Sequence, residues 1–201
     1  MQRATLIVML ALTFTGSAFA EGKKKPEVMT GASASMLANT CAGCHGTKGV
    51  SMGPSIPTLA GMSPTYIIEM MEEYKSGEIP STIMGRIAKG YSEEETQQIA
   101  EFFSKQKFVA AKGQKVDDAK AQKGAKIHKK YCEKCHSESG TEAEDDSGFL
   151  KGQWKSYLRN QLMDFHNGDR EAAKKMKKKL KKMYKKYGDE GVEALIEYYS
   201  K

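Results

Sequence analysis

Two short cysteine motifs constrain this chain more than any other feature of its sequence. The pentapeptide Cys-x-x-Cys-His occurs at residues 41–45 and again at residues 132–136, and the two copies use all four cysteines of the chain. A gap of two residues places the two thiols about one helical turn apart, so both can add to one porphyrin ring while the adjacent histidine reaches the iron. Each motif therefore predicts covalent attachment of a c-type haem, through Cys41 and Cys44 in the first copy and Cys132 and Cys135 in the second.

Other uses of paired cysteines compete with haem attachment. Cys-x-x-Cys is also a spacing found in zinc sites, thioredoxin-like redox proteins carry it near a βαβ pattern, and a disulfide is the simplest alternative. We see no βαβ pattern around either motif. The cellular compartment of the chain helps to decide between haem attachment and the zinc or disulfide alternatives.

The N-terminus indicates export. Residues 1–20 have the pattern of a secretory signal peptide, with Arg3, an apolar run over residues 4–14 and an Ala-x-Ala cleavage site that ends at Ala20. The apolar run is too short for a permanent membrane anchor. We therefore expect a periplasmic protein that begins at Glu21, in the compartment where bacteria assemble haem c, and this favours haem over zinc.

The chain is also an internal repeat. A shift of 91 positions superposes the two cysteine motifs and matches further pairs: Gly49 with Gly140, Leu59 with Leu150, Gly61 with Gly152, Tyr66 with Tyr157 and Gly77 with Gly168. Repeats of this kind indicate duplicated structural units. We predict a first cytochrome c domain over residues 21–112 and a second over residues 113–201, each folded around one haem that supplements a small apolar core.

The local patterns predict helices and no strand. One helix is expected to begin with Ser63 as its cap and Pro64 in its first turn, and to end at Gly77. Ser92 begins a capping box at the start of another helix. The expected helices cover residues 32–40, 64–76, 92–106, 123–131, 154–167 and 189–201. Residues 108–122 are polar and are interpreted as a linker. The predicted fold class is all-α, with two tandem cytochrome c-type domains.

The repeat also selects candidates for the sixth ligand of each iron. His45 and His136 supply one axial ligand each, and methionine is a common second ligand that raises the reduction potential. The chain has twelve methionines. The shift of 91 places Lys175 opposite Met84, with Met176 one residue later, and the second half carries a five-residue insertion in this region. We therefore take Met84 and Met176 as the corresponding pair and predict them as ligands. Met183 is the nearest competitor to Met176, and most other methionines are expected to fill the core.

Histidine coordination of both axial positions is the alternative. His128 lies four residues before Cys132, on the same side as the attachment motif. His166 matches Lys75 in the repeat, so only one half could use it. We expect both histidines at the surface or behind the iron ligands.

Positive charge is concentrated in one segment. The formal net charge is +7, and residues 174–186 contain nine lysines. Such a run is either a solvated helix face or a surface that steers an acidic partner to the second haem. Nucleic acid is excluded as a partner for a protein outside the cytoplasm.

The motifs and their surroundings resemble two related families. The sequence at residues 40–46, with Gly53-Pro54 and Leu59-Ala60-Gly61, is similar to tandem dihaem cytochromes of the c4 type. The run at residues 74–92, which contains Met84, resembles the cytochrome subunit of flavocytochrome c sulfide dehydrogenase more closely. Agreement with that subunit continues at residues 131–136, 152–154 and 174–176.

The second resemblance implies an electron-transfer function. In that family a periplasmic heterodimer oxidises sulfide on a flavoprotein subunit that holds FAD and a redox-active disulfide. Electrons then pass to the two covalently bound haems and on to a soluble acceptor. For this chain, the lysine run at residues 174–186 leads us to expect an acidic protein or another cytochrome as that acceptor. The residues that match Met84 and Met176 are the sixth ligands there.

Two other functions compete with this one. A free-standing dihaem shuttle would deliver electrons to a terminal oxidase. A dihaem peroxidase or thiosulfate-oxidising enzyme would need an open or cysteine-ligated iron, and no cysteine is left over. No acid/base or nucleophile constellation is visible in the sequence, so we expect no catalytic residue in this chain.

Overall fold

The computed structural model describes residues 31–141 and 148–201, and residues 32–201 form one compact unit. The expected signal peptide at residues 1–20 lies outside the described residues. Every regular element in the described ranges is a helix, and these ranges contain no strand. This agrees with the predicted all-α fold.

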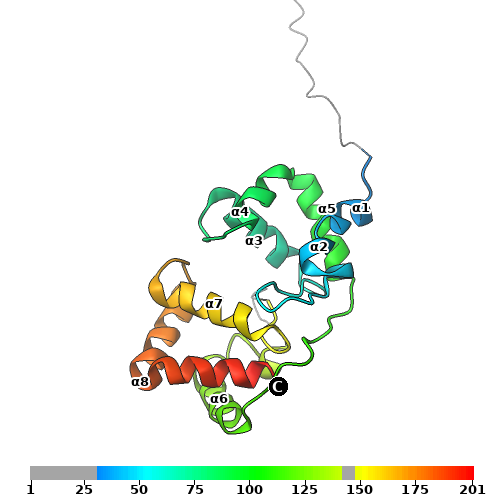
Figure 1. The fold of residues 1–201 in the computed structure, drawn as a ribbon. Helices are drawn as coiled ribbons and strands as arrows, with labels where there is room; N and C mark the ends of the chain where they lie inside the picture. The colour runs from blue at the N-terminus through cyan, green and yellow to red at the C-terminus, as the bar shows by residue number, and fades with distance from the viewer. Residues whose placement is uncertain (1–30, 142–147) are drawn as a thin grey trace, which may run out of the picture. The chain divides into compact units, whose positions relative to one another are not determined.

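In the first half, the described residues from 31 onward form five α-helices, labelled in Figure 1. They are α1 (Ala34–Asn39), α2 (Ala42–His45), α3 (Pro64–Ser76), α4 (Met84–Ile87) and α5 (Glu93–Ser104), with 3₁₀ turns η1 (Thr47–Gly49) and η2 (Ala88–Gly90). The start of α3 follows its sequence signals, because the Ser63 hydroxyl accepts a hydrogen bond from the Tyr66 amide and Gly77 ends the helix in the left-handed conformation. The capping box of α5 is confirmed as well, since Ser92 and Glu95 each accept the other's backbone N–H.

In the second half, the residues that the structure describes on either side of 142–147 form three longer α-helices. They are α6 (Asp118–Tyr131), α7 (Lys155–Asn167) and α8 (Lys174–Tyr199), with a 3₁₀ turn η3 (Glu138–Gly140). Two boundaries differ from the prediction. Helix α6 begins inside the expected linker, because the Asp117 side chain caps the Lys120 amide. Helix α8 begins at Lys174, well before the predicted start, and is interrupted at Gly188 with φ of 56° and ψ of −152°.

The internal repeat is visible in the backbone hydrogen bonds. The carbonyl of Gly49 accepts from the Leu59 amide at 2.8 Å, and the carbonyl of Gly140 accepts from the Leu150 amide at 2.9 Å. Both glycines have positive φ, 78° and 84°, so each closes the same left-handed turn after its cysteine motif. The two halves therefore share a local backbone path as well as a sequence pattern.

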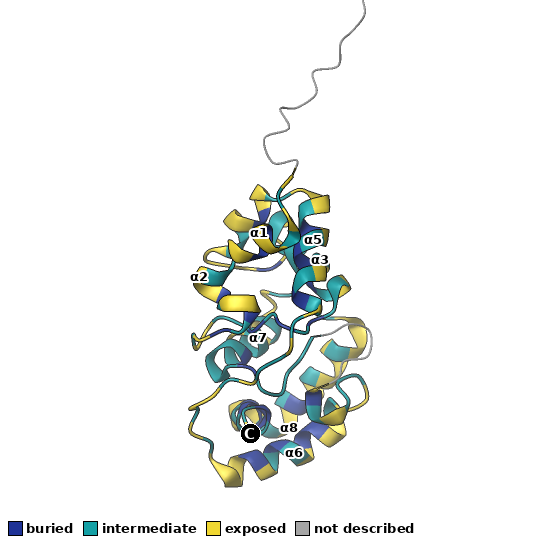
Figure 2. Ribbon diagram, turned by 90° about the vertical axis from the view of Figure 1, so that its right-hand side faces the viewer, coloured by how far each residue is buried: buried dark blue, intermediate teal, exposed yellow. Residues whose placement is uncertain are grey.

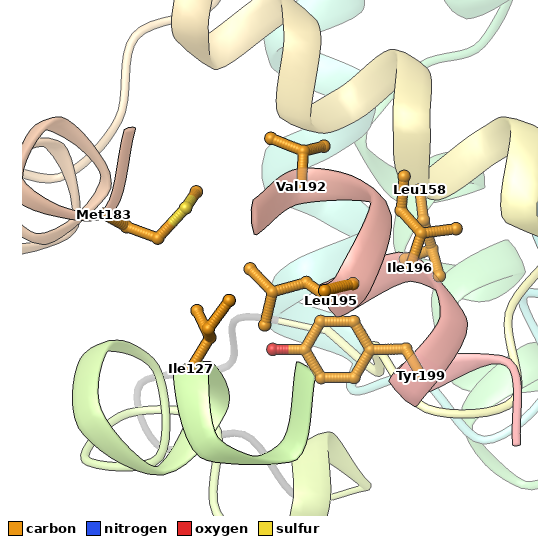
Figure 3. Close-up of a cluster of buried hydrophobic side chains, with 8 residues drawn as sticks. Ile127, Leu158, Met183, Val192, Leu195, Ile196 and Tyr199 are labelled. Carbon is orange, nitrogen blue, oxygen red and sulfur yellow. The ribbon is translucent and has the colours of Figure 1, made fainter. Parts of the chain in front are cut away.

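Each half has its own apolar core, and Figure 2 shows the buried residues on the helices of both halves. The first core consists of Leu37, Ala38, Met62, Ile67, Ile99, Ala100 and Phe103. The second, drawn in Figure 3, consists of Ile127, Leu158, Met183, Val192, Ala194, Leu195, Ile196 and Tyr199. Helices α6 and α8 approach closely at Gly124, where an added Cβ would lie 1.9 Å from the Ala194 carbonyl oxygen.

Candidate functional site

The first cysteine motif forms one helical turn. Cys41 precedes α2, Cys44 lies within it and is exposed, and His45 is its last residue. The His45 amide donates to the Cys41 carbonyl at 2.9 Å, which brings the attachment residues and the histidine into a single turn. Cys41 and Cys44, like the two cysteines of the second motif, are free thiols. The arrangement leaves both sulfurs available for thioether bonds.

The imidazole of His45 is oriented by a backbone carbonyl. Its side chain is buried, and Nδ1 lies 2.9 Å from the carbonyl oxygen of Pro57. With the Nδ1 proton donated to that carbonyl, Nε2 carries the free lone pair, as in histidines that bind metals. Burial lowers the pKa of His45, which favours the neutral imidazole that an iron requires. His45 therefore fits the role of an axial ligand.

The loop that orients His45 is held from the second half of the chain. Gln153 accepts from the Thr58 amide at 3.0 Å and donates to the Thr58 carbonyl at 2.9 Å, and both residues are fully buried. Thr58 also accepts from the Ser51 amide through its hydroxyl, at 3.2 Å. The Trp154 indole donates to the Ser51 carbonyl at 3.2 Å. The position of His45 in the first half thus depends on side chains of the second half.

The second motif opens into a cavity of about 650 Å³. Cys132, Cys135, His136 and Met176 all line it, so the structure brings together the four residues predicted for the second haem. The volume lies within the roughly 300–1,000 Å³ of typical cofactor sites. Four residues of α3, namely Tyr66, Glu69, Met70 and Glu73, complete the wall from the first half. The cavity, its paired thiols and its histidine fit a covalently attached haem.

Burial shifts the ionisation of groups in the second motif. It raises the pKa of the Cys132 thiol to about 11 and lowers the pKa of His136. The lower pKa of His136 favours the neutral imidazole that an iron ligand requires.

The methionine candidates differ in burial. Met176 is half-buried and lines the same cavity as His136. Met183 also touches the cavity, but it is fully buried in the apolar core between α6 and α8 (Figure 3). Met84 is the half-buried first residue of α4, which packs on α3. The assignment of Met84 and Met176 as iron ligands stays a prediction.

The two remaining histidines are engaged elsewhere. His128 is buried, not at the surface, and its Nδ1 lies 2.8 Å from the Tyr199 hydroxyl. His166 is exposed and stacks on Tyr184, with ring centroids 3.7 Å apart. Neither is among the described residues that line the cavity.

Comparison with known proteins agrees with this geometry. Residues 29–103 match the family described as cytochrome c oxidase, cbb3-type, subunit III. Cytochrome c4 of Pseudomonas aeruginosa is 30% identical over 177 residues, which cover 85% of this chain and 84% of that protein. The chain belongs to the cytochrome c4 family. Its fold is that of the reduced recombinant cytochrome c4 from Pseudomonas stutzeri, with a TM-score of 0.69, 26% identity and coverage of 83% of this chain and 95% of that one.

A second relative is more similar over a shorter stretch. The cytochrome subunit of sulfide dehydrogenase from Chlorobaculum tepidum is 47% identical over 81 residues, 39% of this chain and 73% of that protein. The cytochrome c4 relatives establish membership of the c4-like family, and with it electron transfer by a c-type cytochrome with covalently bound haem c. The narrower resemblance to the sulfide dehydrogenase subunit rests on part of the chain.

The lysine run of this cytochrome lies in the N-terminal part of α8 and surrounds an apolar stripe. The inward residues Met176, Leu180 and Met183 follow helical spacing, while the lysines between them are exposed. Some of them, with Lys130 at the end of α6, surround a second, basic cleft of about 550 Å³, whose lining residues are Lys130, Tyr131, Lys179, Lys182, Lys185 and Lys186. In the described ranges no helix is long and apolar enough to cross a membrane.

Sequence reasoning missed several residues around the cavity. Tyr66 and Tyr157, which the repeat aligns with each other, meet where the two halves touch. Burial raises the pKa of Tyr157 well above its usual value. Arg170 follows α7 and lines the cavity as well. The only sequence signal for the tyrosines was their equivalence in the repeat, and none existed for Arg170.

Proposed function

We propose that this cytochrome is the dihaem electron-transfer subunit of a flavocytochrome c sulfide dehydrogenase. It accepts electrons from an FAD-containing partner and passes them to an external acceptor. Two haems would be attached and ligated by these residues: Cys41, Cys44, His45 and Met84 for the first, and Cys132, Cys135, His136 and Met176 for the second. The 47% identity to a sulfide dehydrogenase cytochrome subunit is the observation that supports this function over a general electron carrier.

The cellular setting is part of the same proposal. Residues 1–20 are a signal peptide cleaved after Ala20, and the mature chain works in the periplasm as two domains, residues 21–112 and 113–201. The signal-like N-terminus and the cysteine motifs support this setting, since haem c is assembled outside the cytoplasm.

Catalysis would reside in the partner. All four cysteines are committed to attachment, so none remains for a cysteine-ligated iron. The chain then contributes haem-binding residues and a docking surface, and the flavoprotein contributes the site where sulfide is oxidised.

A free-standing shuttle is the second candidate. The c4 relative covers 85% of this chain, more than the sulfide dehydrogenase subunit does. In that case the same two haems would carry electrons to a terminal oxidase without a permanent partner.

Purification from the native source at low salt separates the two candidates. We expect a flavin-containing chain to co-purify, and sulfide to reduce the haems only when that chain is present. Dithionite should reduce the haems of the isolated cytochrome, which controls for intact haem. A cytochrome that purifies alone and is not reduced through any flavoprotein supports the shuttle. Rapid sulfide oxidation by the isolated chain would contradict both.

The exposed lysine face of α8 is the proposed exit surface for an acidic acceptor. Charge reversal at Lys178 and Lys181 should slow electron transfer to the acceptor at low ionic strength and have little effect at high salt. Reversal at Lys105 and Lys107, which are exposed in the first half, is the matched control. Equal rates in both double variants would reduce the lysine run to a solvated helix face.

A further inference from the structure

Arg170 is a buried cation at the edge of the second cavity. Its side chain is only 10% exposed, and its Nε is a buried donor with no hydrogen-bond partner. It lines the same cavity as Cys132, Cys135 and His136. A buried guanidinium with an unused donor is costly unless an anion neutralises it.

The protein groups around Arg170 compensate part of its charge but leave its Nε donor unused. Its Nη2 lies 3.0 Å from the sulfur of Met70 and 3.9 Å from a carboxylate oxygen of Glu73, beyond hydrogen-bond distance. Its Nη1 donates to the neutral side-chain amide of Gln161, and its guanidinium lies over the Phe165 ring, 4.7 Å from the centroid. These contacts fix the plane of the guanidinium. Glu73 balances part of its charge as an ion pair without a hydrogen bond, and Nε still has no acceptor.

The other cations that line the cavity are of a different kind. They are the exposed lysines Lys134, Lys175, Lys178, Lys179 and Lys182. Solvent screens such exposed charges, whereas a buried guanidinium acts on its surroundings at lower effective dielectric. Arg170 is therefore the cation best placed to bind a carboxylate inside the cavity.

The first half has no such residue at the matching place. The shift of 91 positions aligns Arg170 with Ile79, which is buried at 3% exposure. The backbones correspond, because the Ile79 amide donates to the Glu73 carbonyl at 3.3 Å and the Arg170 amide donates to the Asp164 carbonyl at 3.1 Å. The same turn thus presents an apolar side chain in one half and a cation in the other.

We propose that Arg170 binds a propionate carboxylate of the haem attached to Cys132 and Cys135, and that its charge raises the reduction potential of that haem above the value it would otherwise have. This inference rests on the proposed function, in which the second cavity takes a haem. Guanidinium and carboxylate form paired, charge-assisted hydrogen bonds, and Nε–H is one of the donors used in such pairs. A nearby positive charge disfavours the ferric state, which carries one more positive charge than the ferrous state. Arg170 thereby biases electrons toward the second haem, on the side of the lysine face.

The test is a potentiometric titration of the purified dihaem protein. In Arg170→Gln and Arg170→Met, one of the two midpoint potentials should fall and the other should stay. Arg170→Lys should recover part of the shift, because it keeps the charge and loses the fork of donors. Arg159→Gln is the matched control: Arg159 pairs with Glu193 at 2.8 and 2.6 Å, does not line the cavity, and should leave both potentials unchanged.

Nuclear magnetic resonance of the reduced wild-type protein tests the contact without any variant. The Arg170 Nε proton should exchange slowly with solvent and show a through-space contact with a propionate of the second haem. Unchanged potentials in Arg170→Gln, or an Nε proton that contacts no propionate, would overturn the inference and leave Arg170 as a packing contact of α3. The haem count of the wild-type protein tests the proposed function separately, since a single haem per chain would refute that function whatever Arg170 does.

Discussion

Replacing Gln153 by methionine should weaken the structure and disturb the first haem, although Gln153 belongs to the second half. The substitution keeps an unbranched side chain of similar length and removes both hydrogen bonds to Thr58, at 3.0 and 2.9 Å. The Thr58 amide and carbonyl then stay buried without partners. Each such group costs about 1–3 kcal/mol, so the free energy of unfolding should fall by about 2–6 kcal/mol.

Denaturant titration of the holoprotein, followed by circular dichroism, measures that loss. Gln97→Met is the matched control, because Gln97 is exposed and hydrogen-bonds only to Glu101 within the same helix. Its effect should remain below about 0.5 kcal/mol. A loss in Gln153→Met no larger than in Gln97→Met would show that water or a shifted loop satisfies Thr58, and the reasoning would be refuted.

The same variant has a spectroscopic consequence. Thr58 follows Pro57, whose carbonyl receives the Nδ1 proton of His45. Loosening that loop weakens the hydrogen bond that makes the imidazole a stronger donor to iron. The ligand-field spectrum of one haem should change while the other stays constant, and a change confined to the haem ligated by His136 would contradict the path through Thr58.

Three further predictions concern single positions. Met176→Ala should abolish the near-infrared Fe(III)–Met band of one haem. Met183→Ala should keep both bands and lower the free energy of unfolding by about 2–5 kcal/mol, because it truncates a core side chain. The reverse pattern would exchange the roles of Met176 and Met183. Gly124→Ala should destabilise the fold by about 1–3 kcal/mol or prevent folding, because its Cβ would lie 1.9 Å from a carbonyl of α8, while Gly90→Ala, with open space at Cβ, should be tolerated in the same unfolding assay. Hydrogen bonds from Arg159 lower the pKa of Glu193, so the Glu193 carboxylate stabilises the fold above about pH 4.3 and loses this effect as the pH falls. Glu193→Gln should therefore lower the free energy of unfolding by less than about 1 kcal/mol at pH 7 and flatten the acid limb of a stability–pH curve. An unchanged curve would show that the exposed Arg159–Glu193 pair contributes nothing.

The sequence predicted elements whose signals are local. The bounds of α3 follow from Ser63, Pro64 and Gly77, and the start of α5 follows from the capping box at Ser92, because caps depend on neighbouring residues alone. The cysteine motifs and the repeat were sufficient for the all-α fold.

The two boundaries that were missed have different causes. Helix α6 begins at a local signal, the Asp117 cap, within a polar segment that was interpreted as a linker. Helix α8 continues through a lysine run whose few apolar residues become informative only when they pack on α6 and α7. The interaction of Gln153 with Thr58 joins residues 95 positions apart, and no pairing rule within one half contains it. Arg170 was missed because its matching residue is an isoleucine, so the repeat gave no reason to examine it.

The wall that α3 contributes to the second cavity has a consequence for assembly. The N-terminal half emerges first during synthesis, whereas the cavity beside the second attachment motif is enclosed by Tyr66, Met70 and Glu73 of that half. A fragment that starts at residue 113 would contain Cys132, Cys135 and His136 but only part of the enclosure. The duplicated halves have thus become mutually dependent in structure, since α3 of the first encloses the second cavity and Gln153 of the second holds the Thr58 loop of the first.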